Sequence, residues 1–232
     1  MSDRQPIIAF ALFPGVTQLD FTGPHQVFAS LPGDEVILAS ATGGSIEASG
    51  MTFSGLRRLA DIPACDVICV PGGLGITDNA IHDTVFLSEL RRLADGARYV
   101  TSVCTGSLAL GAAGLLRGKR AACHWAWREL LTLFGATPDA GRVVRDGHVI
   151  TGGGVTAGID FALTLVSMLV DRNTAEAIQL RLEYNPAPPF NSGSPDTASA
   201  ETLALIRERI APHQARRQEA VARAAARLTE SA

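Results

Sequence analysis

Neither sign of charge dominates this sequence of 232 residues. Its 20 basic residues face 23 acidic ones, the net charge is −3 at pH 7, and the pI is near 5.9. A nucleic-acid-binding domain usually carries a basic surplus, and this sequence has none. The longest apolar stretch, residues 159–170, is shorter than the ~20 residues that cross a bilayer and is interrupted by polar ones. We therefore expect neither nucleic acid nor a membrane among the partners.

Cysteine is scarce, and its spacing excludes two common uses. The four cysteines include no CxxC pair, and Cys65 and Cys69 would lie roughly 13 Å apart on one strand, too far for a disulfide. The spacing does not match a structural zinc site either, so we expect no metal. Residues 1–6 lack the apolar core of a signal peptide. The expected location is a reducing, cytoplasmic compartment.

Short apolar runs alternate with helical patterns over roughly the first 170 residues. This alternation is typical of an α/β fold with a mostly parallel sheet and helices on both faces. Residues 46–53 predict a hairpin that leaves the main sheet. The expected strands are 7–13, 35–40, 66–70, 99–103, 118–122 and a hairpin pair within 143–150; the expected helices begin near 20 and after 154, and span 85–94, 125–134 and 174–183.

The C-terminal segment has a different pattern. Residues 185–195 are rich in proline and glycine and predict extended chain. Two helices follow, 198–210 and 213–228, which we expect Pro212 to separate. The sequence thus predicts an α/β domain over residues 1–182 and an extension over 183–232 that packs on this core or on a partner subunit.

One cysteine lies at a position suited to a nucleophile. The β-branched strand 99–103 stops at Cys104, and a helical pattern of small residues starts directly afterwards. This strand–turn–helix geometry holds the sulfur at the carboxyl end of the sheet, over a helix N-terminus that favours the thiolate. The alternative is a buried structural cysteine.

Four loops are expected at the same edge of the sheet. They are residues 14–20, 71–75, 104–106 and 151–154, and each follows a predicted strand. In a parallel sheet the ligand site lies outside the carboxyl ends of the strands. We therefore expect the functional site where these loops meet.

These features resemble a known family. Cys104 on its turn, Asp20 on the first loop and the Pro71-Gly72-Gly73 turn are similar to the DJ-1/PfpI superfamily over roughly residues 7–170. The segments 18–24, 102–106, 113–116, 124–125 and 183–190 resemble its isonitrile (isocyanide) hydratase branch. The resemblance implies a flavodoxin-like, DJ-1-like fold of the class I glutamine amidotransferase-like kind, a homodimer, and no metal or organic cofactor.

The resemblance also implies a reaction. Cys104 would attack the terminal carbon of an isonitrile, R–N≡C, and water would then release an N-substituted formamide from the thioimidate. Asp20 would be the general acid and base. Burial beside a thiolate would raise the pKa of Asp20, so that it holds a proton near neutrality. The alternative for Asp20 is a helix N-cap.

Five further residues remain open between a functional and a structural role. The hydroxyl of Thr105 either bonds Asp20 or a water molecule, or caps the helix that follows it. Gly72 and Gly73 either turn their N–H groups toward the reacting centre, or form a tight turn that needs positive φ. His124 is either a structural histidine or a second catalytic group, and Trp125 either lines an apolar pocket or belongs to the core.

Three other functions compete with this interpretation. A glyoxalase or amidohydrolase of the same fold is disfavoured, because Thr105 stands where a histidine follows the cysteine in such enzymes. The ligand-sensing half of a transcription regulator is disfavoured because residues 183–232 show no compact trihelical reader. A redox sensor based on Cys104 is the third, and it is compatible with catalysis.

Overall fold

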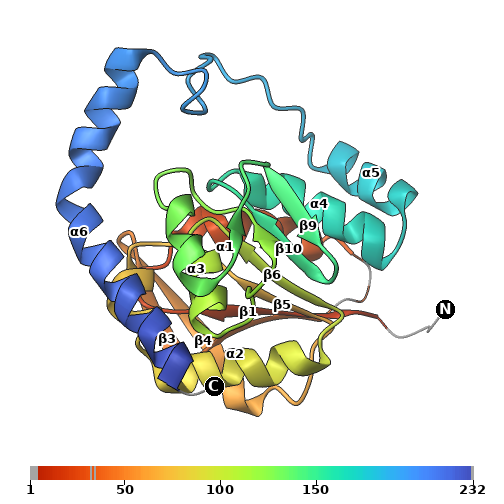
Figure 1. Ribbon diagram of the computed structural model, residues 1–232. Helices are drawn as coiled ribbons and strands as arrows, with labels where there is room; N and C mark the ends of the chain where they lie inside the picture. The colour runs from red at the N-terminus through yellow and green to blue at the C-terminus, as the bar shows by residue number, and fades with distance from the viewer. Residues whose placement is uncertain (1–4, 32, 34, 231–232) are drawn as a thin grey trace.

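In residues 5–31, 33 and 35–230, which the computed structural model describes, eight strands form one mixed sheet in the order β3-β4-β2-β1-β5-β6-β10-β9 (Figure 1). Its five central strands run parallel to one another. The predicted mostly parallel sheet is therefore confirmed. The central strands are β1 (Ile7–Leu12), β2 (Glu35–Ser40), β5 (Val67–Val70), β6 (Tyr99–Val103) and β10 (Val149–Gly152).

Both edges of the sheet are antiparallel hairpins. At one edge, β3 (Gly44–Ala48) pairs with β4 (Met51–Arg58), and the end of β4 joins β2 in parallel. The expected hairpin therefore does not leave the sheet but forms its edge. At the other edge, β9 (Val143–Asp146) pairs with β10 through the predicted turn at Gly147, which has a φ of +64°.

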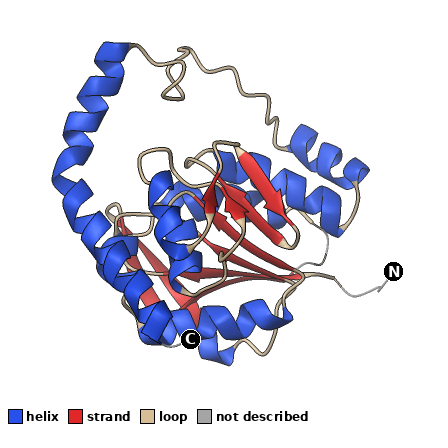
Figure 2. Ribbon diagram, viewed as in Figure 1, coloured by secondary structure: helices blue, strands red, loops and turns tan. Residues whose placement is uncertain are grey.

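Helices cover both faces of the sheet (Figure 2). On one face, α1 (Gln18–Phe28) packs on α4 (Ala157–Leu169), which in turn contacts α5 (Arg172–Arg181). On the other face lie α2 (Thr84–Gly96) and α3 (Gly106–Ala112), with the short helical turns η1 (Leu59–Asp61) and η2 (Ile76–Ala80) beside them.

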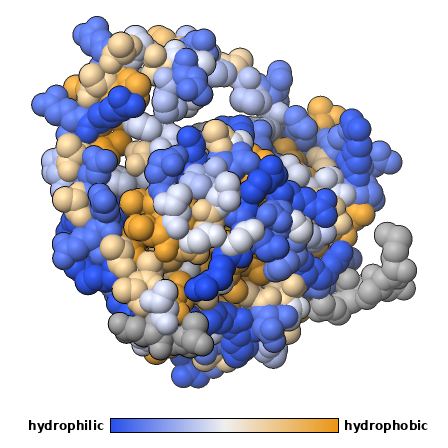
Figure 3. Space-filling view, viewed as in Figure 1, coloured by the Kyte–Doolittle hydropathy of each residue, from blue (hydrophilic) through white to orange (hydrophobic). Residues whose placement is uncertain are grey.

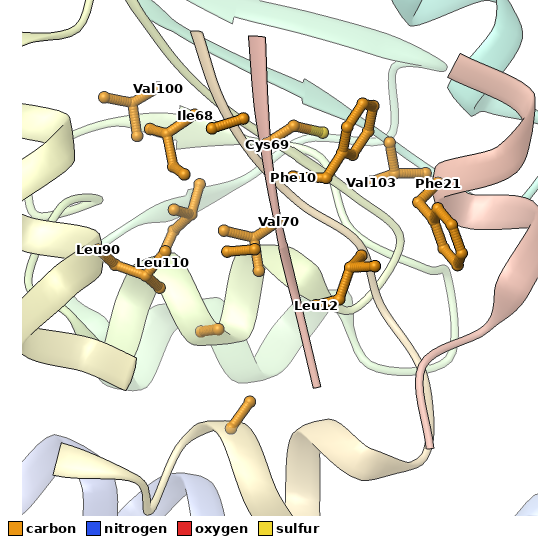
Figure 4. Packing of buried hydrophobic residues seen from close by; sticks show 14 of the residues in the cluster. Phe10, Leu12, Phe21, Ile68, Cys69, Val70, Leu90, Val100, Val103 and Leu110 are labelled. Carbon is orange, nitrogen blue, oxygen red and sulfur yellow. The ribbon is translucent and has the colours of Figure 1, made fainter. Parts of the chain in front are cut away.

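Apolar side chains of the central strands fill the space between sheet and helices. Phe10 and Leu12 of β1 are completely buried. Ile68 and Val70 of β5 lie on the side of the helical residues Leu90 and Leu110 (Figure 4). Burying such side chains contributes about 25 cal/mol per Å² of apolar surface. The core therefore fixes the strand ends from which the site is built.

Residues 125–134 do not form the expected α-helix. A turn leads into the 3₁₀ segment η3 (Arg128–Phe134), and the two-stranded pair β7 (Arg120–Ala121) and β8 (Thr137–Pro138) flanks it outside the main sheet. Leu131 and Phe134 are the buried residues of η3. Their spacing of three matches the repeat of a 3₁₀ helix, in which positions i and i+3 eclipse.

The C-terminal extension forms an arm and one long helix. The arm, defined here as residues 183–199, has no regular helix or strand, and α6 (Ala200–Glu230) follows it. The expected break at Pro212 is wrong, because the helix continues through this exposed residue. The space-filling view shows a hollow between the arm and the body of the molecule (Figure 3).

The second half of α6 packs on the body of the protein. Its buried residues, Arg217, Ala220, Val221 and Ala224, follow helical spacing and face α3, η2 and η3. No helix among the described residues combines the length and apolarity needed to span a bilayer.

Candidate active site

Cys104 occupies the sharp turn between β6 and α3. Its φ is +59°, a left-handed conformation that costs a residue other than glycine about 1–3 kcal/mol. The backbone N–H of Cys104 donates to the carbonyl of Gly152 at 3.0 Å, which ties the turn to the end of β10. The side chain is only 5% exposed. The structure therefore confirms the strand–turn–helix geometry that the sequence predicts.

Asp20 lies in the first turn of α1 and is completely buried. The N-cap of this helix is Thr17, so the N-cap alternative for Asp20 is wrong. Gly72 holds this turn in two ways. Its N–H donates to Oδ2 of Asp20 at 2.8 Å, and its carbonyl accepts from the N–H of Thr17 at 2.8 Å. The carboxyl is thereby fixed at the end of β5.

Asp20 and Cys104 influence each other's ionisation. Burial raises the pKa of Asp20 to about 7, and the N–H of Gly72 and the thiol of Cys104 partly oppose this rise. Burial, the charge of Asp20 and the nearby Cys123 raise the pKa of the Cys104 thiol well above its ordinary value, while the N–H of Thr105 acts against them. The two groups therefore form a coupled pair.

The expected resting thiolate is not favoured. The short helix α3 does not offset the loss of hydration, because burial is the largest influence on Cys104. Below pH 7 both Asp20 and the thiol are mostly protonated; above pH 7 the pair holds one proton, which lies on sulfur, and Asp20 carries the charge. Oδ1 of Asp20 has no well-formed hydrogen bond among the described residues, although the thiol interacts with this carboxyl. This oxygen is the natural acceptor for the proton of the thiol.

The Gly72-Gly73 turn has no room for side chains. A Cβ on Gly72 would lie 2.5 Å from the nitrogen of Thr105 and 2.8 Å from Oδ2 of Asp20. Gly73 has a φ of +148°, and a Cβ there would lie 2.4 Å from the carbonyl of Gly15. Glycine is thus required at both positions for close approach of the backbone.

The N–H groups of this turn already have partners. Gly72 donates to Asp20, and Gly73 donates to Oγ1 of Thr105 at 2.9 Å. The N–H of Gly72 therefore faces one member of the Cys104–Asp20 pair, and the N–H of Gly73 faces Thr105. Thr105 occupies the N-cap position of α3, one of the two predicted alternatives, although its hydroxyl makes no cap hydrogen bond. The hydroxyl donates to the carbonyl of Gly73 at 3.3 Å and does not bond Asp20.

The four predicted loops meet as expected. Gly72 of the second loop bonds Asp20 of the first, Thr105 of the third bonds Gly73, and Cys104 bonds Gly152 of the fourth. A buried set of hydrogen bonds that involve side-chain hydroxyls supports the place where the loops meet, and these bonds were not predicted from the sequence. It comprises Ser102 to Ser107 at 2.8 Å, Ser107 to the carbonyl of Ala122 at 2.5 Å, and the N–H of Ala122 to Thr151 at 2.7 Å.

His124 and Trp125 lie outside this meeting point. Nδ1 of His124 accepts from the N–H of Ala126 at 3.3 Å, and burial together with Arg217 lowers the pKa of its imidazole. Trp125 stacks beside His124 at 5.6 Å between ring centroids. It lines a cavity of about 270 Å³ with Ala126, Arg207, Ile210 and Gln214, and neither Cys104 nor Asp20 belongs to that lining.

A larger cavity, of about 420 Å³, has neither Cys104 nor Asp20 in its lining. It opens between the ends of β1 and β2 and the start of α2, with Phe13, Ser40 and Asp83 in its lining. We place the site at Cys104 and Asp20 because reactivity there follows from the coupled pair and not from the size of a hollow. Phe190 is 79% exposed on the arm.

One charged residue beside the site was missed. Arg217 of α6 is 3% exposed; its Nε donates to Oγ1 of Thr77 at 2.6 Å and its terminal NH₂ to the carbonyl of Gly73 at 3.2 Å. The guanidinium carbon lies 4.4 Å from the ring centroid of Trp127. The available signal was its place in the apolar stripe of α6, because an arginine is rarely buried without partners.

The described residues include no group of three or more histidine, cysteine or acidic side chains placed to hold a metal ion. All four cysteines are free and buried.

Comparison with known proteins agrees with this geometry. A family model described as the DJ-1/PfpI family matches residues 7–168. The isonitrile hydratase of Pseudomonas putida is 54% identical over 222 residues, which are 95% of this chain and 97% of that protein. A crystal structure of a THiJ/PfpI family protein from Pseudomonas syringae is 39% identical with a TM-score of 0.90, covering 96% of this chain and 91% of that one. Drosophila melanogaster DJ-1beta, 22% identical with a TM-score of 0.70, shares the fold over 78% of this chain and 98% of its own.

Proposed function

This chain belongs to the DJ-1/PfpI family, and from that premise we propose that it is an isonitrile hydratase, a hydro-lyase that converts R–N≡C and water into an N-substituted formamide. The buried Cys104–Asp20 pair is the observation that carries the proposal. It combines a nucleophile with a carboxyl whose pKa of about 7 lets it accept and return a proton near neutrality.

The first step adds the thiol across the terminal carbon of the substrate. Asp20 takes the proton from Cys104 through its unpartnered Oδ1 as the sulfur bonds to that carbon. The same proton then passes from Asp20 to the carbon, which gives the thioimidate R–N=CH–S–Cys104. All atoms of the substrate are retained, and Asp20 is a carboxylate again at the end of this step.

The second step consumes water. Asp20 accepts a proton from a water molecule that attacks the thioimidate carbon and passes this proton to the nitrogen, which gives the tetrahedral intermediate R–NH–CH(OH)–S–Cys104. Collapse of this intermediate breaks the C–S bond and releases R–NH–CHO, while the hydroxyl proton passes through Asp20 to the sulfur. One water molecule enters for each isonitrile, and no electron is gained or lost.

The glycine turn and Thr105 have a positioning role in this proposal. Gly72 holds Oδ2 of Asp20 and thereby leaves Oδ1 for proton transfer. Thr105 fixes Gly73 from the other side. We propose no direct catalytic role for His124, because it interacts with Ala126, Trp125 and Arg217 rather than with Cys104.

Formamide production by the purified protein tests the proposal. A simple alkyl isonitrile is mixed with wild type, Cys104→Ala and Cys65→Ala, and the formyl proton is followed by NMR. We expect Cys104→Ala to lose at least about 10³-fold in rate. Cys65→Ala is the matched control, because Cys65 is also buried but lies before β5, away from the site. Formamide formed equally by Cys104→Ala would overturn the proposal.

We also propose that residues 183–232 form an extension of an α/β domain over residues 1–182 and that the chain works as a cytoplasmic homodimer. Leu180 and Phe190, beside and within the arm, are 83% and 79% exposed, and a second copy would bury them. Four free cysteines suit a reducing compartment. Light scattering should give about 49 kDa, twice the 24.3 kDa of one chain. A mass near 24 kDa at micromolar concentration would contradict the dimer.

A further inference from the structure

Arg217 is a buried cation whose contacts end at the candidate site. It comes from α6, in the part of the chain most distant in sequence from Asp20, and is only 3% exposed. Burying a guanidinium is costly unless its N–H groups and its charge are matched. Thr77, the carbonyl of Gly73 and the ring of Trp127 provide the contacts.

The charge of Arg217 has no carboxylate within ion-pair distance among the described residues. Asp78, the nearest acidic residue that influences it, forms its salt bridge of 2.7 Å with the neighbouring Arg216. Burial lowers the pKa of Arg217, whereas Cys104, Cys123 and Asp78 act to keep it charged. An electrostatic interaction acts equally on both partners. The positive charge of Arg217 therefore lowers the free energy needed to ionise the thiol of Cys104.

We propose that Arg217 is a positioning residue for the Cys104–Asp20 pair: it fixes the Gly72-Gly73 turn from the side of α6 and balances the negative charge that develops on sulfur as its proton moves to Asp20. The role of Arg217 in the reaction rests on the proposed function, whereas the first experiment below does not use that reaction. It gives the C-terminal extension a direct effect on the chemistry of the core.

The positioning effect follows a short path of contacts. The carbonyl of Gly73 accepts from both Arg217 and Thr105, so the turn is held between α6 and the start of α3. The preceding residue, Gly72, holds Asp20. Without the guanidinium, one of the side-chain donors to this carbonyl is lost, and the carboxyl is oriented less strictly against the thiol.

The effect of the Arg217 charge on the ionisation of Cys104 can be measured, because few other groups near Arg217 change their charge over the same pH range. The side chains that face it are Thr77 and Asp78 of η2, Cys104, and Cys123 and His124 after β7. Burial lowers the pKa of His124 and raises that of Cys123 to about 12. A change in the pH dependence of Cys104 alkylation therefore reports on the Cys104–Asp20 pair, in which burial places the pKa of the thiol well above its ordinary value.

The test is the pH dependence of alkylation of Cys104 by iodoacetamide, which needs no isonitrile. Cleavage after Arg98 and Arg117 yields the peptide 99–117, which contains Cys104 and no other cysteine, so mass spectrometry follows this thiol alone. Arg217→Met should raise the midpoint by about one pH unit and slow alkylation at pH 7 roughly tenfold. Arg223→Met, the same change at an exposed position of α6 paired with Glu219, should match wild type.

Arg217→Lys separates charge from contact and serves if Arg217→Met does not fold. Lysine keeps the charge but lacks the planar fork, so its alkylation midpoint should stay within about 0.3 pH unit of wild type while its formamide production falls. A folded Arg217→Met with the wild-type midpoint, or an Arg217→Lys midpoint that rises by a full unit, would overturn the inference. Because the alkylation does not use the substrate, absence of hydration in wild type would count against the proposed function and leave this test intact.

Discussion

The backbone N–H of Gly72 donates a hydrogen bond of 2.8 Å to Oδ2 of Asp20, across 52 residues of sequence. This contact joins the turn after β5 to the first turn of α1. It also divides the carboxyl into one oxygen that is held and one, Oδ1, that has no well-formed hydrogen bond among the described residues. A carboxyl arranged in this way is oriented by the backbone and still has a free acceptor for the proton of Cys104.

Replacing Asp20 by asparagine should abolish hydration and stabilise the fold above neutral pH. The pKa of Asp20 is 3.8 in its ordinary environment and about 7 when folded, so below pH 3.8 the carboxyl is neutral in both states. As the pH rises toward 7, the unfolded chain ionises first and the folded wild type loses stability. Asparagine has no such penalty, and its gain should reach at most about 4 kcal/mol at pH 8.

Urea unfolding of wild type and Asp20→Asn at pH 5 and pH 8 measures this effect. The difference in free energy of unfolding should be larger at pH 8 than at pH 5. If the difference in free energy of unfolding between the variant and wild type is the same at both pH values, Asp20 is not an ionised, buried carboxylate. Formamide production by the same folded variant at a near-normal rate would exclude its role as acid and base.

The rate of hydration should rise with pH through a midpoint near 7. Below that value Asp20 is protonated and cannot accept the proton of the thiol, whereas above it the pair carries the required single negative charge. The pKa of Cys104 lies well above its ordinary value, so no fall from loss of the second proton is expected up to pH 9. The dependence of kcat/KM on pH from 5 to 9 measures the midpoint. A flat profile across this range would contradict the assignment.

A methyl group added at Gly72 should push Asp20 and Thr105 apart, because Gly72 lies between them. The added Cβ would lie 2.5 Å from the nitrogen of Thr105 and 2.6 Å from its Oγ1, so backbone must move. Gly72→Ala should cost about 1–3 kcal/mol of stability and at least tenfold in hydration rate. Gly96→Ala is the matched control, because a Cβ there meets nothing within 4 Å in α2 and should stabilise by up to about 1 kcal/mol. Equal activity in both variants would show that the Gly72-Gly73 turn does not position the site.

The hydroxyl of Thr105 should matter through Gly73. Thr105→Val leaves the buried N–H of Gly73 without its acceptor, which costs about 1–3 kcal/mol, whereas Thr105→Ser keeps the bond. Chemical unfolding and formamide production of the two variants are compared. If valine and serine are equally stable and equally active, the bond between Thr105 and Gly73 contributes nothing measurable.

The sheet and the place of the nucleophile were predictable from sequence because both follow from local patterns. β2 and β6 begin and end at the predicted residues, and Cys104 stands where a β-branched run meets a run of small residues. The convergence of the four loops follows from one rule, that the ends of parallel strands share an edge. Local patterns also show that an acidic residue, Asp20, lies in the loop after the first strand, so its place near the nucleophile was predictable.

Features set by tertiary contacts were not predictable. The helix N-terminus at Cys104 indicates a thiolate, but the extent of burial that reverses this is known only from the packed structure. The partner of Thr105 depends on where Gly73 lies, and the contact between Arg217 and Gly73 spans 144 residues. Pro212 does not end α6, because tertiary packing of the second half of the helix supports the chain beyond it.

The central claim is that the sulfur of Cys104 forms a bond to the substrate carbon. Acid quenching within milliseconds of mixing the protein with an isonitrile, followed by mass spectrometry of the peptide 99–117, measures this bond directly. The account predicts that this peptide gains the full mass of the isonitrile in wild type and gains nothing in Cys104→Ser. Steady formamide production with no added mass on this peptide, or equal production by Cys104→Ser, would contradict it.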